Sequence, residues 1–584
     1  MSTFIHAIDN HMGVLNSARK IGENGHIEYT WNIDQIQERI VQFHFQCVRC
    51  SNIEQRNLLK NTLNDLLYTI KQKLALDVEN NIHEYKQQLH KQLVTLFKMI
   101  GQCRDITSGK GERDLSYMMI CCWYKYYPEM AKLALRCFVN LGDEKPYGSW
   151  KDMKLLCQYV YDTTGSKAHP IIEYCMIMMC EQLKKDSEMK DAFTEMSLCA
   201  RWIPREKSKY SWLFKILALM YFPQYTRTAK NVESISKAVT KTYMTFARFI
   251  AGLNKILDTV QIKMCGGNWA AIDHNKTTSV TLIKNRAAFM NQSKKRGPSA
   301  KLDRIKCADN FEAYVESCVK QDKNIKGSCV GIIDFVKNGY SLNYTNNQLE
   351  KTVLNSQWDD FMTKVGDLGN MVVMADQSGS MLCDGGDPYY ACIGLSIAIA
   401  KKSVLGSRVM TFSTEPAWVS LDGCNTFTDY IYNLQQADSL AGMSTNFFKS
   451  LKLILDSCIA AKLDDNVVSN MVFVILSDMQ INEADTSNKH TMFETIKIMY
   501  NDAGYSKIPH ILFWNLRSTN GFPSLSSTEN TSMLSGFSPV LLNVFCKKGI
   551  DILQHLTPWS MLVESLAHER YDILERELME FLEK

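Results

Sequence analysis

Two short apolar runs, far apart in the chain, each end in acidic and hydroxyl side chains. The first run, Met371–Ala375, is followed by one aspartate and two serines, and the second, Met471–Leu476, is followed by a serine and an aspartate. Such short, wholly apolar runs are typical of central strands in a parallel sheet that is covered on both faces. Ligands of these sheets bind beyond the carboxyl ends of the strands. The sequence therefore predicts a polar site at one edge of a sheet.

The side chains after these runs are oxygen donors. Those expected at the site are Asp376, Ser378, Ser380, Thr445 and Asp478. Carboxylate and hydroxyl oxygens suit a hard divalent cation, Mg²⁺ or Mn²⁺, which prefers octahedral oxygen ligands and retains positions for water or a partner. Neutral hydroxyls leave the ion with much of its charge, so it can still attract an acidic group from outside. The alternative is a metal-free turn and helix cap, because Asp and Ser favour those positions.

From about residue 366 onward, strand patterns alternate with helix patterns. Further strands are expected at Arg408–Phe412, Trp418–Leu421, Ile511–Asn515 and Val540–Phe545. Helices are expected at Tyr390–Ser403, Phe427–Gln436, Phe447–Ala461, Thr491–Asn501 and Ile550–His555, with a last helix running to Lys584. This alternation predicts a doubly wound α/β domain over residues 366–584.

Residues 34–365 have a different pattern, in which apolar side chains recur every three or four positions and Gly, Pro or Asp interrupt the series. We expect successive helix pairs to stack as a HEAT-like array, with a globular helical bundle as the alternative. Residues 1–33 form an N-terminal extension. The predicted fold class is therefore multidomain, α followed by α/β.

The composition is that of a globular protein with a large core, since 46% of the 584 residues are hydrophobic and 22% are charged. The 19 cysteines are scattered, and the first residues lack the apolar core of a signal peptide, so we expect reduced thiols. No apolar run reaches the roughly 20 residues that cross a bilayer. We expect a soluble intracellular protein in the cytoplasm, with a nuclear location also open.

A basic stretch precedes the α/β domain. Its cations are Lys294, Lys295, Arg296, Lys301, Arg304 and Lys306. They could contact phosphates of single-stranded or structured RNA, although the net charge of +4 does not demand such a partner. A solvated loop or a localisation signal is the alternative. Lys110, Arg113, Arg201 and Arg205 lie at helix breaks and could do the same, whereas Trp150 and Trp202 are expected to pack in the core.

The five oxygen donors resemble the metal-ion-dependent adhesion site (MIDAS) of von Willebrand factor A domains. In that family the first three residues and the threonine bind the ion directly or through water, and the last aspartate often acts through water. A helical array before such a domain resembles the TROVE/Ro family of RNA-binding proteins. A closer resemblance is to a family of unassigned function in plants, fungi and giant DNA viruses. The segments that carry it are residues 109–114, 147–152, 200–205, 476–480, 557–559 and 569–571.

This resemblance implies a non-catalytic binding protein whose bound Mg²⁺ recruits an acidic group of a protein partner, or a phosphate, while the helices bind RNA. Neither a membrane nor a specific DNA sequence is an expected partner. One alternative is a scaffold subunit for an ATPase partner, because this chain has no phosphate-binding loop of its own. A metal-dependent hydrolase is a further alternative, but no second metal and no general base are evident in the sequence.

Overall fold

The computed structural model describes residues 19–22, 25–76, 82–189, 196–227, 231–292, 297–345, 347–412, 416–438, 447–480, 490–546 and 553–584. The chain divides into two compact units. Unit 1 comprises residues 1–115 together with 318–584, and unit 2 comprises residues 116–317. The division by compactness does not follow the boundary expected at residue 365, because N-terminal helices pack with the C-terminal sheet and residues 318–365 pack on helices that flank it.

The described part of unit 1 contains a six-stranded sheet with the order β5-β4-β3-β6-β7-β8. Its strands are β3 (Met371–Asp376), β4 (Arg408–Phe412), β5 (Ala417–Ser420), β6 (Val472–Ser477), β7 (His510–Asn515) and β8 (Thr531–Ser535). All neighbours are parallel except β4 and β5, which are antiparallel. The predicted α/β region and its two central strands are confirmed.

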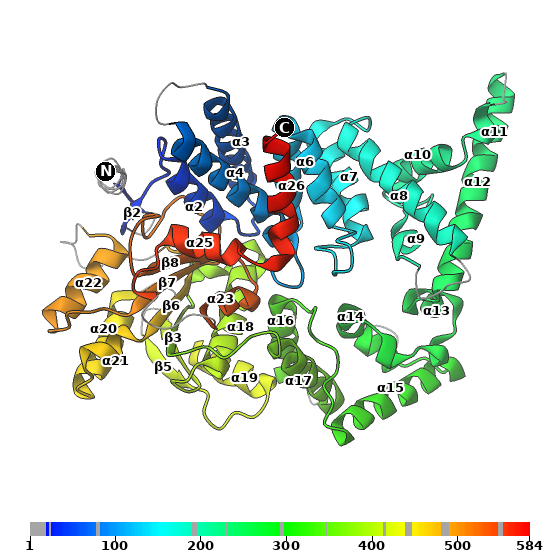
Figure 1. The fold of residues 1–584 in the computed structure, drawn as a ribbon. Helices are drawn as coiled ribbons and strands as arrows, with labels where there is room; N and C mark the ends of the chain where they lie inside the picture. Colours follow the sequence, from blue (N-terminus) through cyan, green and yellow to red (C-terminus); the bar gives the residue numbers. More distant parts are fainter. Residues whose placement is uncertain are drawn as a thin grey trace. The chain divides into compact units, whose positions relative to one another are not determined.

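Helices cover the sheet, and this cover explains why its central strands are almost wholly apolar. The helix after β3, α18 (Asp387–Lys402), packs on β3, β4 and β6, and α20 (Phe447–Ala460) packs on β4 (Figure 1). Further helices between strands are α19 (Phe427–Asp438), α21 (Asp465–Ser469) and α22 (Met492–Asp502). A second layer forms where α16 (Ile332–Asn343) packs on α18 and α19, and α17 (Gln348–Met362) packs on α16 and α19. Both faces of the central strands are thereby removed from water.

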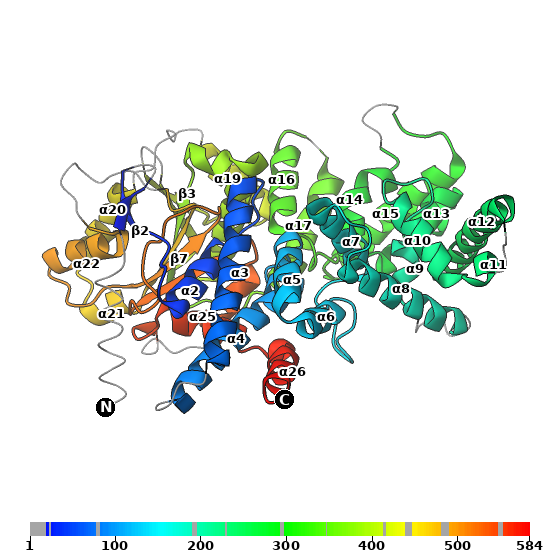
Figure 2. The ribbon, with the colours of Figure 1, turned by 90° about the horizontal axis from the view of Figure 1, so that it is seen from above.

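Both ends of the chain complete unit 1. Helix α2 (Ile36–Gln46) packs on β8 together with α25 (Pro558–Leu566), and α4 (Ile82–Arg104) packs against α3 (Ile53–Ala75) and the last helix, α26 (Asp572–Leu582) (Figure 2). The short strands β1 (Arg19–Ile21) and β2 (Ile27–Tyr29) pair antiparallel before α2. The segments nearest the two termini therefore belong to one core.

Specific polar contacts fix this N-terminal region onto the C-terminal one. Asn515 Nδ2 donates to the Phe45 carbonyl oxygen at 2.9 Å, and Arg570 Nε donates to Asp105 Oδ2 at 2.7 Å. The loop after α4 folds back because Gly109 has no Cβ, which would lie 2.0 Å from the Gln102 carbonyl oxygen. The two hydrogen bonds, from Asn515 to Phe45 and from Arg570 to Asp105, each join residues more than 400 positions apart.

Most predicted strands and helices agree with the structure within a few residues, but one strand is wrong. Residues 540–545 form a 3₁₀ turn (Pro539–Leu542) and a short helix, α23 (Asn543–Cys546), instead of a strand. The missed strand is β8, whose serines and threonine read as a polar loop in the sequence. Of the helix expected at residues 550–555, the first three residues lie outside the described ranges.

The elements of unit 2 are helical. Its described helices are α6 (Pro128–Cys137), α7 (Trp150–Thr164), α8 (Pro170–Glu188), α9 (Cys199–Trp202), α10 (Ser211–Tyr221), α11 (Gln224–Arg227), α12 (Val232–Leu257), α13 (Val260–Gly266) and α14 (Ser279–Phe289), together with the greater part of α5 (Asp114–Tyr126) and of α15 (Leu302–Lys320). Neighbours in sequence pack on one another, for example α7 on α8 and α10 on α12. The predicted helical region is confirmed, whereas its likeness to HEAT repeats stays a prediction.

Two of the expectations from the sequence concern the whole chain: that its cysteines are reduced, and that no segment crosses a membrane. All 19 cysteines are free thiols, and most of them are buried. Among the described helices, none combines the length and the apolar character that a membrane span requires.

Candidate functional site

The register of the sheet brings the two acidic strand ends together. Strands β3 and β6 are parallel neighbours, with Ala375 opposite Leu476, so Asp376 and Asp478 both lie at the carboxyl edge. Both side chains are fully buried. The register of β3 and β6 therefore brings Asp376, Ser378 and Asp478 to one edge of the sheet, as the sequence predicts.

Asp376 is held by a set of short hydrogen bonds. Its Oδ1 accepts from the Ser378 backbone N–H at 2.9 Å, and its Oδ2 accepts from Ser477 Oγ at 2.5 Å. The hydroxyl oxygens of Ser378 and Ser380 lie 3.0 Å apart. These contacts fix the carboxylate and place two further oxygens beside it.

Burial and charge act together on this aspartate. Burial and, to a smaller extent, the charge of Asp478 together raise the pKa of Asp376 to about 7, against the opposing effect of the hydrogen bonds from Ser378 and Ser477. Two buried carboxylates that repel each other are stabilised when a cation lies close to both. The electrostatics of this edge thus favour a positively charged group.

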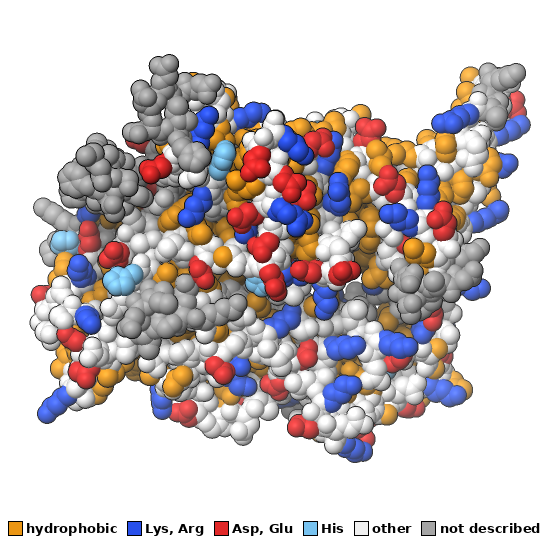
Figure 3. All heavy atoms as spheres, in the orientation of Figure 1, with side chains coloured by type: hydrophobic (Ala, Val, Ile, Leu, Met, Phe, Trp, Pro, Cys, Tyr) orange, Lys and Arg blue, Asp and Glu red, His pale blue; other side chains and the backbone are white. Residues whose placement is uncertain are grey.

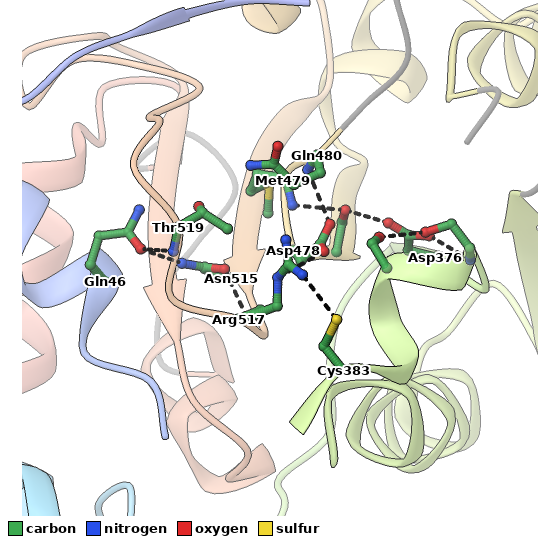
Figure 4. A network of polar contacts seen from close by, with 12 residues as sticks. Gln46, Asp376, Cys383, Asp478, Met479, Gln480, Asn515, Arg517 and Thr519 are labelled. Carbon is green, nitrogen blue, oxygen red and sulfur yellow. Dashed lines mark hydrogen bonds and ion pairs between the residues drawn. The ribbon is translucent and has the colours of Figure 1, made fainter. Parts of the chain in front are cut away.

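One such group belongs to the chain itself. Arg517 follows β7 and places its Nε 3.1 Å from Asp478 Oδ2 (Figure 4). The same guanidinium reaches Cys383 Sγ at 3.3 Å from its Nη1, and the Arg517 backbone N–H donates to Asn515 Oδ1. Asp478 Oδ1 accepts from the Gln480 backbone N–H at 3.1 Å. Each carboxylate oxygen of Asp478 therefore has a partner: the Gln480 backbone N–H lies at Oδ1, and the charged Arg517 guanidinium lies at Oδ2.

The N-terminal segment of unit 1 forms one side of this edge. Gln46 Oε1 accepts from the Thr519 backbone N–H at 2.6 Å and lies 3.4 Å from Asn515 Nδ2 (Figure 4). The Ser51 backbone N–H donates to Asp384 Oδ1 at 3.0 Å, in the loop that follows Ser380. The candidate site is thus enclosed by chain segments from both ends of the sequence.

The site residues predicted from the sequence lie in several different places. Asp376, Ser378, Ser380 and Asp478 lie at the carboxyl edge, whereas Thr445 lies outside the described residues. Of the basic stretch, Lys294, Lys295 and Arg296 also lie outside the described residues, and Lys301 and Lys306 are exposed at the start of α15.

Two cations with expected phosphate contacts also contact other parts of the protein. Arg304 is partly buried, stacks 3.8 Å from the centroid of Trp269 and donates to the Ala288 carbonyl oxygen. Lys110 is buried and donates from Nζ to the Cys47 carbonyl oxygen and to Ser535 Oγ. The buried head group of Lys110 is not presented as a surface charge, so the structure argues against a phosphate contact there, whereas the phosphate contact expected of Arg304 stays a prediction.

The tryptophans expected in the core differ from that expectation, since Trp150 and Trp202 are only partly buried. Around Trp202, three cations lie over the ring: Lys151 at 5.4 Å, Lys154 at 5.1 Å and Arg201 at 5.2 Å from its centroid. Lys154 also lies 5.2 Å from the ring of Tyr210. We call these five residues the basic-aromatic face of unit 2.

The donor set at the sheet edge fits a hard divalent cation. It consists of carboxylate and hydroxyl oxygens, and no sulfur or imidazole competes among the four described members. Gln377, between two of these donors in sequence, is 6% exposed, and neither of its amide atoms has a hydrogen-bond partner among the described residues. The described residues contain no cluster of three His, Cys, Asp or Glu side chains, and a site that uses serine and threonine hydroxyls needs none.

Sequence reasoning noted Ser477 at a strand end without assigning it a role, and it missed Arg517 and Cys383. A signal was available for Arg517, because it comes two residues after a predicted strand and so belongs to the same carboxyl edge as the aspartates. The contacts of Gln46 and Ser51 had no local signal, since they depend on how the two ends of the chain meet.

Comparison with known families divides the chain near residue 370. Residues 174–371 match the family described as "Domain of unknown function (DUF2828)", and residues 370–569 match "Domain of unknown function (DUF7788)". A protein of Acanthamoeba polyphaga mimivirus, "Uncharacterized protein L728", is 27% identical over 487 residues, which cover 80% of this chain and 78% of the viral protein. The expected resemblance to a giant-virus protein is therefore confirmed.

Proposed function

We propose that this chain is a non-catalytic, metal-dependent binding protein of the von Willebrand A type, with a TROVE-like helical region. The observation that carries the proposal is the pair of fully buried carboxylates, Asp376 and Asp478, at the carboxyl edge of neighbouring parallel strands. Bound Mg²⁺ or Mn²⁺ would offset their repulsion and supply a positive charge for an incoming acidic group.

The residues of the chain have distinct parts in this proposal. Asp376, Ser378 and Ser380 would hold the ion, with Thr445 and Asp478 completing the set. The Ser378 backbone N–H and the Ser477 hydroxyl orient the Asp376 carboxylate before the ion binds. Because these donors are fixed in advance, little ordering accompanies binding. The partner is an acidic side chain of another protein, or a phosphate.

The proposal is tested by measuring Mn²⁺ binding to the full chain by electron paramagnetic resonance. Asp376→Ala should lose Mn²⁺ binding and keep its circular dichroism spectrum, because the strand remains buried. Asp422→Ala, at an exposed position that pairs with Arg408, is the matched control and should bind Mn²⁺ as the wild type does. Equal binding by Asp376→Ala and the wild type would exclude this site.

A second function, RNA binding by unit 2, is supported by the basic-aromatic face. Along α7, Lys151 and Lys154 share a stripe with Gln158 and Tyr161, at spacings of three, four and three residues, so they lie on one side of the helix. Burial lowers the pKa of Lys154, and the charges of Lys151 and Lys209 lower it further, which indicates a concentration of positive charge. Cations beside aromatic rings suit single-stranded nucleic acid, through phosphate contacts and base stacking.

Charge reversal tests this second function. The double variant Lys154→Glu, Arg201→Glu should lose most of its affinity for a fluorescent single-stranded RNA oligonucleotide, and binding should weaken as salt rises. The comparison variant is Lys301→Glu, Lys306→Glu, on the stretch that the sequence singled out, and it should lose less. The reverse order of losses would assign the contacts to α15 instead. We expect no preference for a particular DNA sequence. We expect the protein to be intracellular and to lie in the cytoplasm.

A scaffold role for an ATPase partner is the remaining alternative. It would use the same sheet edge, since an acidic side chain of the partner could complete the coordination of the ion. Co-purification with an ATPase that disappears on chelation with EDTA would favour it over the RNA function. Turnover of phosphodiesters that Asp376→Ala abolishes would favour a hydrolase instead.

A further inference from the structure

The exposed side of α12 carries a row of cations that neither proposed function uses. With its other side, on which Phe246 and Ile250 are buried, α12 packs on α9, α10 and α11 (Figure 1). The row consists of Lys241, Arg248 and Lys255, which are exposed and follow one another at intervals of seven residues. Figure 3 shows Lys and Arg side chains over the part of the surface that α12 forms.

The charges of this row are not balanced by carboxylates of the same unit. Within the described part of unit 2, no Asp or Glu side chain forms an ion pair with Lys241, Arg248 or Lys255. Lys241 lies 4.6 Å from the centroid of the Tyr225 ring of α11, and this contact leaves its charge in place. A row of like charges attracts a partner of opposite charge.

Apolar and small side chains run beside the cations. Met244 and Ala251 are also seven residues apart, and Met244 is 50% exposed. Gly252 is exposed, and a Cβ at that position would meet no atom within 4 Å. One turn before Met244, Lys237 pairs with Glu233 at 2.6 Å. An open depression of about 390 Å³ lies between the Met, Lys, Arg, Ser and Thr side chains of residues 236–248.

The interval of seven residues matches a second helix. Seven residues span about 10.5 Å along a helix and nearly two full turns, so each row stays on one side of α12. Where two helices pack side by side, apolar residues at this interval form the seam, and charged residues beside the seam pair with the other helix. Acidic residues at the same interval on a partner helix would therefore lie opposite Lys241, Arg248 and Lys255.

The aromatic rings of α12 argue for a protein at this face rather than a nucleic acid. Tyr243 and Phe246 lie against Phe214 of α10, and Phe249 stacks on Tyr221 with the ring centroids 4.8 Å apart. Single-stranded nucleic acid is bound through rings on which its bases stack. The rings of α12 pack within unit 2 instead, so its outer face differs from the basic-aromatic face.

We propose that the outer face of α12 is a docking surface for an acidic amphipathic helix of a partner protein. Apolar side chains of that helix would pack over Met244 and Ala251, and its Asp or Glu side chains would pair with Lys241, Arg248 and Lys255. The complementary charge and the helical interval together select this class of partner. The surface lies within unit 2 and depends neither on the cation site of the sheet edge nor on RNA binding.

Binding of a designed helical peptide to the full chain tests the proposal. The peptide has three heptads with Leu at the seam and Glu beside it, where the repulsion between Glu side chains opposes self-association, and its twin has Lys in place of each Glu. Fluorescence anisotropy of the labelled peptides measures their affinities. We expect the wild type to bind the Glu peptide and not the Lys peptide. Lys241→Glu, Arg248→Glu should bind the Glu peptide roughly tenfold more weakly, as two reversed surface charges imply, and should bind the Lys peptide better than the wild type does.

The matched control is Lys301→Glu, Lys306→Glu, which changes the charge of the same unit by the same amount at exposed positions at the start of α15. It should bind the Glu peptide as the wild type does. Equal losses in the two double variants would reduce the effect to net charge and overturn the proposal, as would a wild type that does not bind the Glu peptide.

Two further measurements keep the proposal open to contradiction. Met244→Glu retains the three cations and serves if the double variant does not fold; an unchanged affinity for the Glu peptide would overturn packing at the seam. The single-stranded RNA oligonucleotide is titrated into the same variants. If Lys241→Glu, Arg248→Glu loses as much RNA affinity as Lys154→Glu, Arg201→Glu does, α12 belongs to the RNA surface and the proposal of a helical protein partner fails.

Discussion

Charged side chains are used in opposite ways by the buried aspartates of unit 1 and by the basic-aromatic face of unit 2. In unit 1, Asp105, Asp376 and Asp478 are fully buried, and each has hydrogen-bond or ion-pair partners from distant parts of the chain. In unit 2, Lys154 and Arg201 are only partly buried and lie over an aromatic ring. The space-filling view also shows Lys and Arg side chains scattered over the outer surface (Figure 3).

Under the proposed functions, this difference would determine what each of the two regions recognises. A buried charge must be compensated in a fixed geometry, because the interior offers little solvation, so it selects one small ion or one partner group. A partly exposed cation retains water and moves on a flexible stem, so it accepts any polyanion of suitable shape. Four predictions bear on this comparison, in order of decreasing free-energy change.

The largest effect is expected where a buried charge loses its partner. Arg570→Ala leaves the buried carboxylate of Asp105 without its guanidinium, and it should lower the free energy of unfolding of unit 1 by about 3–5 kcal/mol. Denaturant titration measures the change. The control Arg408→Ala breaks an exposed pair and should change stability by about 1 kcal/mol or less. Equal losses in both variants would remove the distinction between buried and exposed charges.

The second prediction concerns pH. Burial raises the pKa of Glu38 from 4.5 to about 7, partly opposed by hydrogen bonds with Ser526. The stabilising contribution of the protonated acid is fully present below about pH 4.5 and is lost as the pH rises through 7. Between pH 5 and pH 8 this group should lower stability by up to about 3 kcal/mol. Glu38→Gln should remove that part of the pH dependence, and parallel stability profiles of wild type and variant would contradict the prediction.

The third prediction tests the surface side of the comparison. Trp202→Leu removes the ring over which three cations lie, and it should weaken RNA binding by about 1–3 kcal/mol, the value of one stacked base. Fluorescence anisotropy measures this change. Trp418→Leu, at an exposed tryptophan of β5, should have no effect on RNA binding. An equal loss in both variants would mean that exposed tryptophans in general, rather than this face, bind RNA.

The smallest effect is expected from one hydroxyl at the metal site. Ser378→Ala retains the backbone N–H that orients Asp376 but removes one proposed ligand, so Mn²⁺ binding should weaken by about 1 kcal/mol. Ser457→Ala, on the exposed side of α20, provides the control. A loss as large as that in Asp376→Ala would show that the serine orders the whole loop.

How much could be predicted from the sequence varies between elements. The strand that ends in Asp376 and the strand that Asp478 follows were predicted within one residue, because wholly apolar runs of this length have few other uses. Strand β8 was missed because three of its five residues, Thr531, Ser532 and Ser535, are polar; they are buried because α2 and α25 pack on the strand. Trp202 was assigned to a core because aromatic residues usually are buried, and no local pattern indicated the cations around it.

By itself, the sequence determined the elements and which donors follow them, because local periodicity and strand ends depend on residues close together in the chain. Only the tertiary structure decided which charges neutralise one another. The pairs Arg517 with Asp478 and Arg570 with Asp105 join different elements, and the second joins opposite ends of the sequence. Such pairs form where packing brings distant backbones within a few ångströms, and no local pattern specifies that approach.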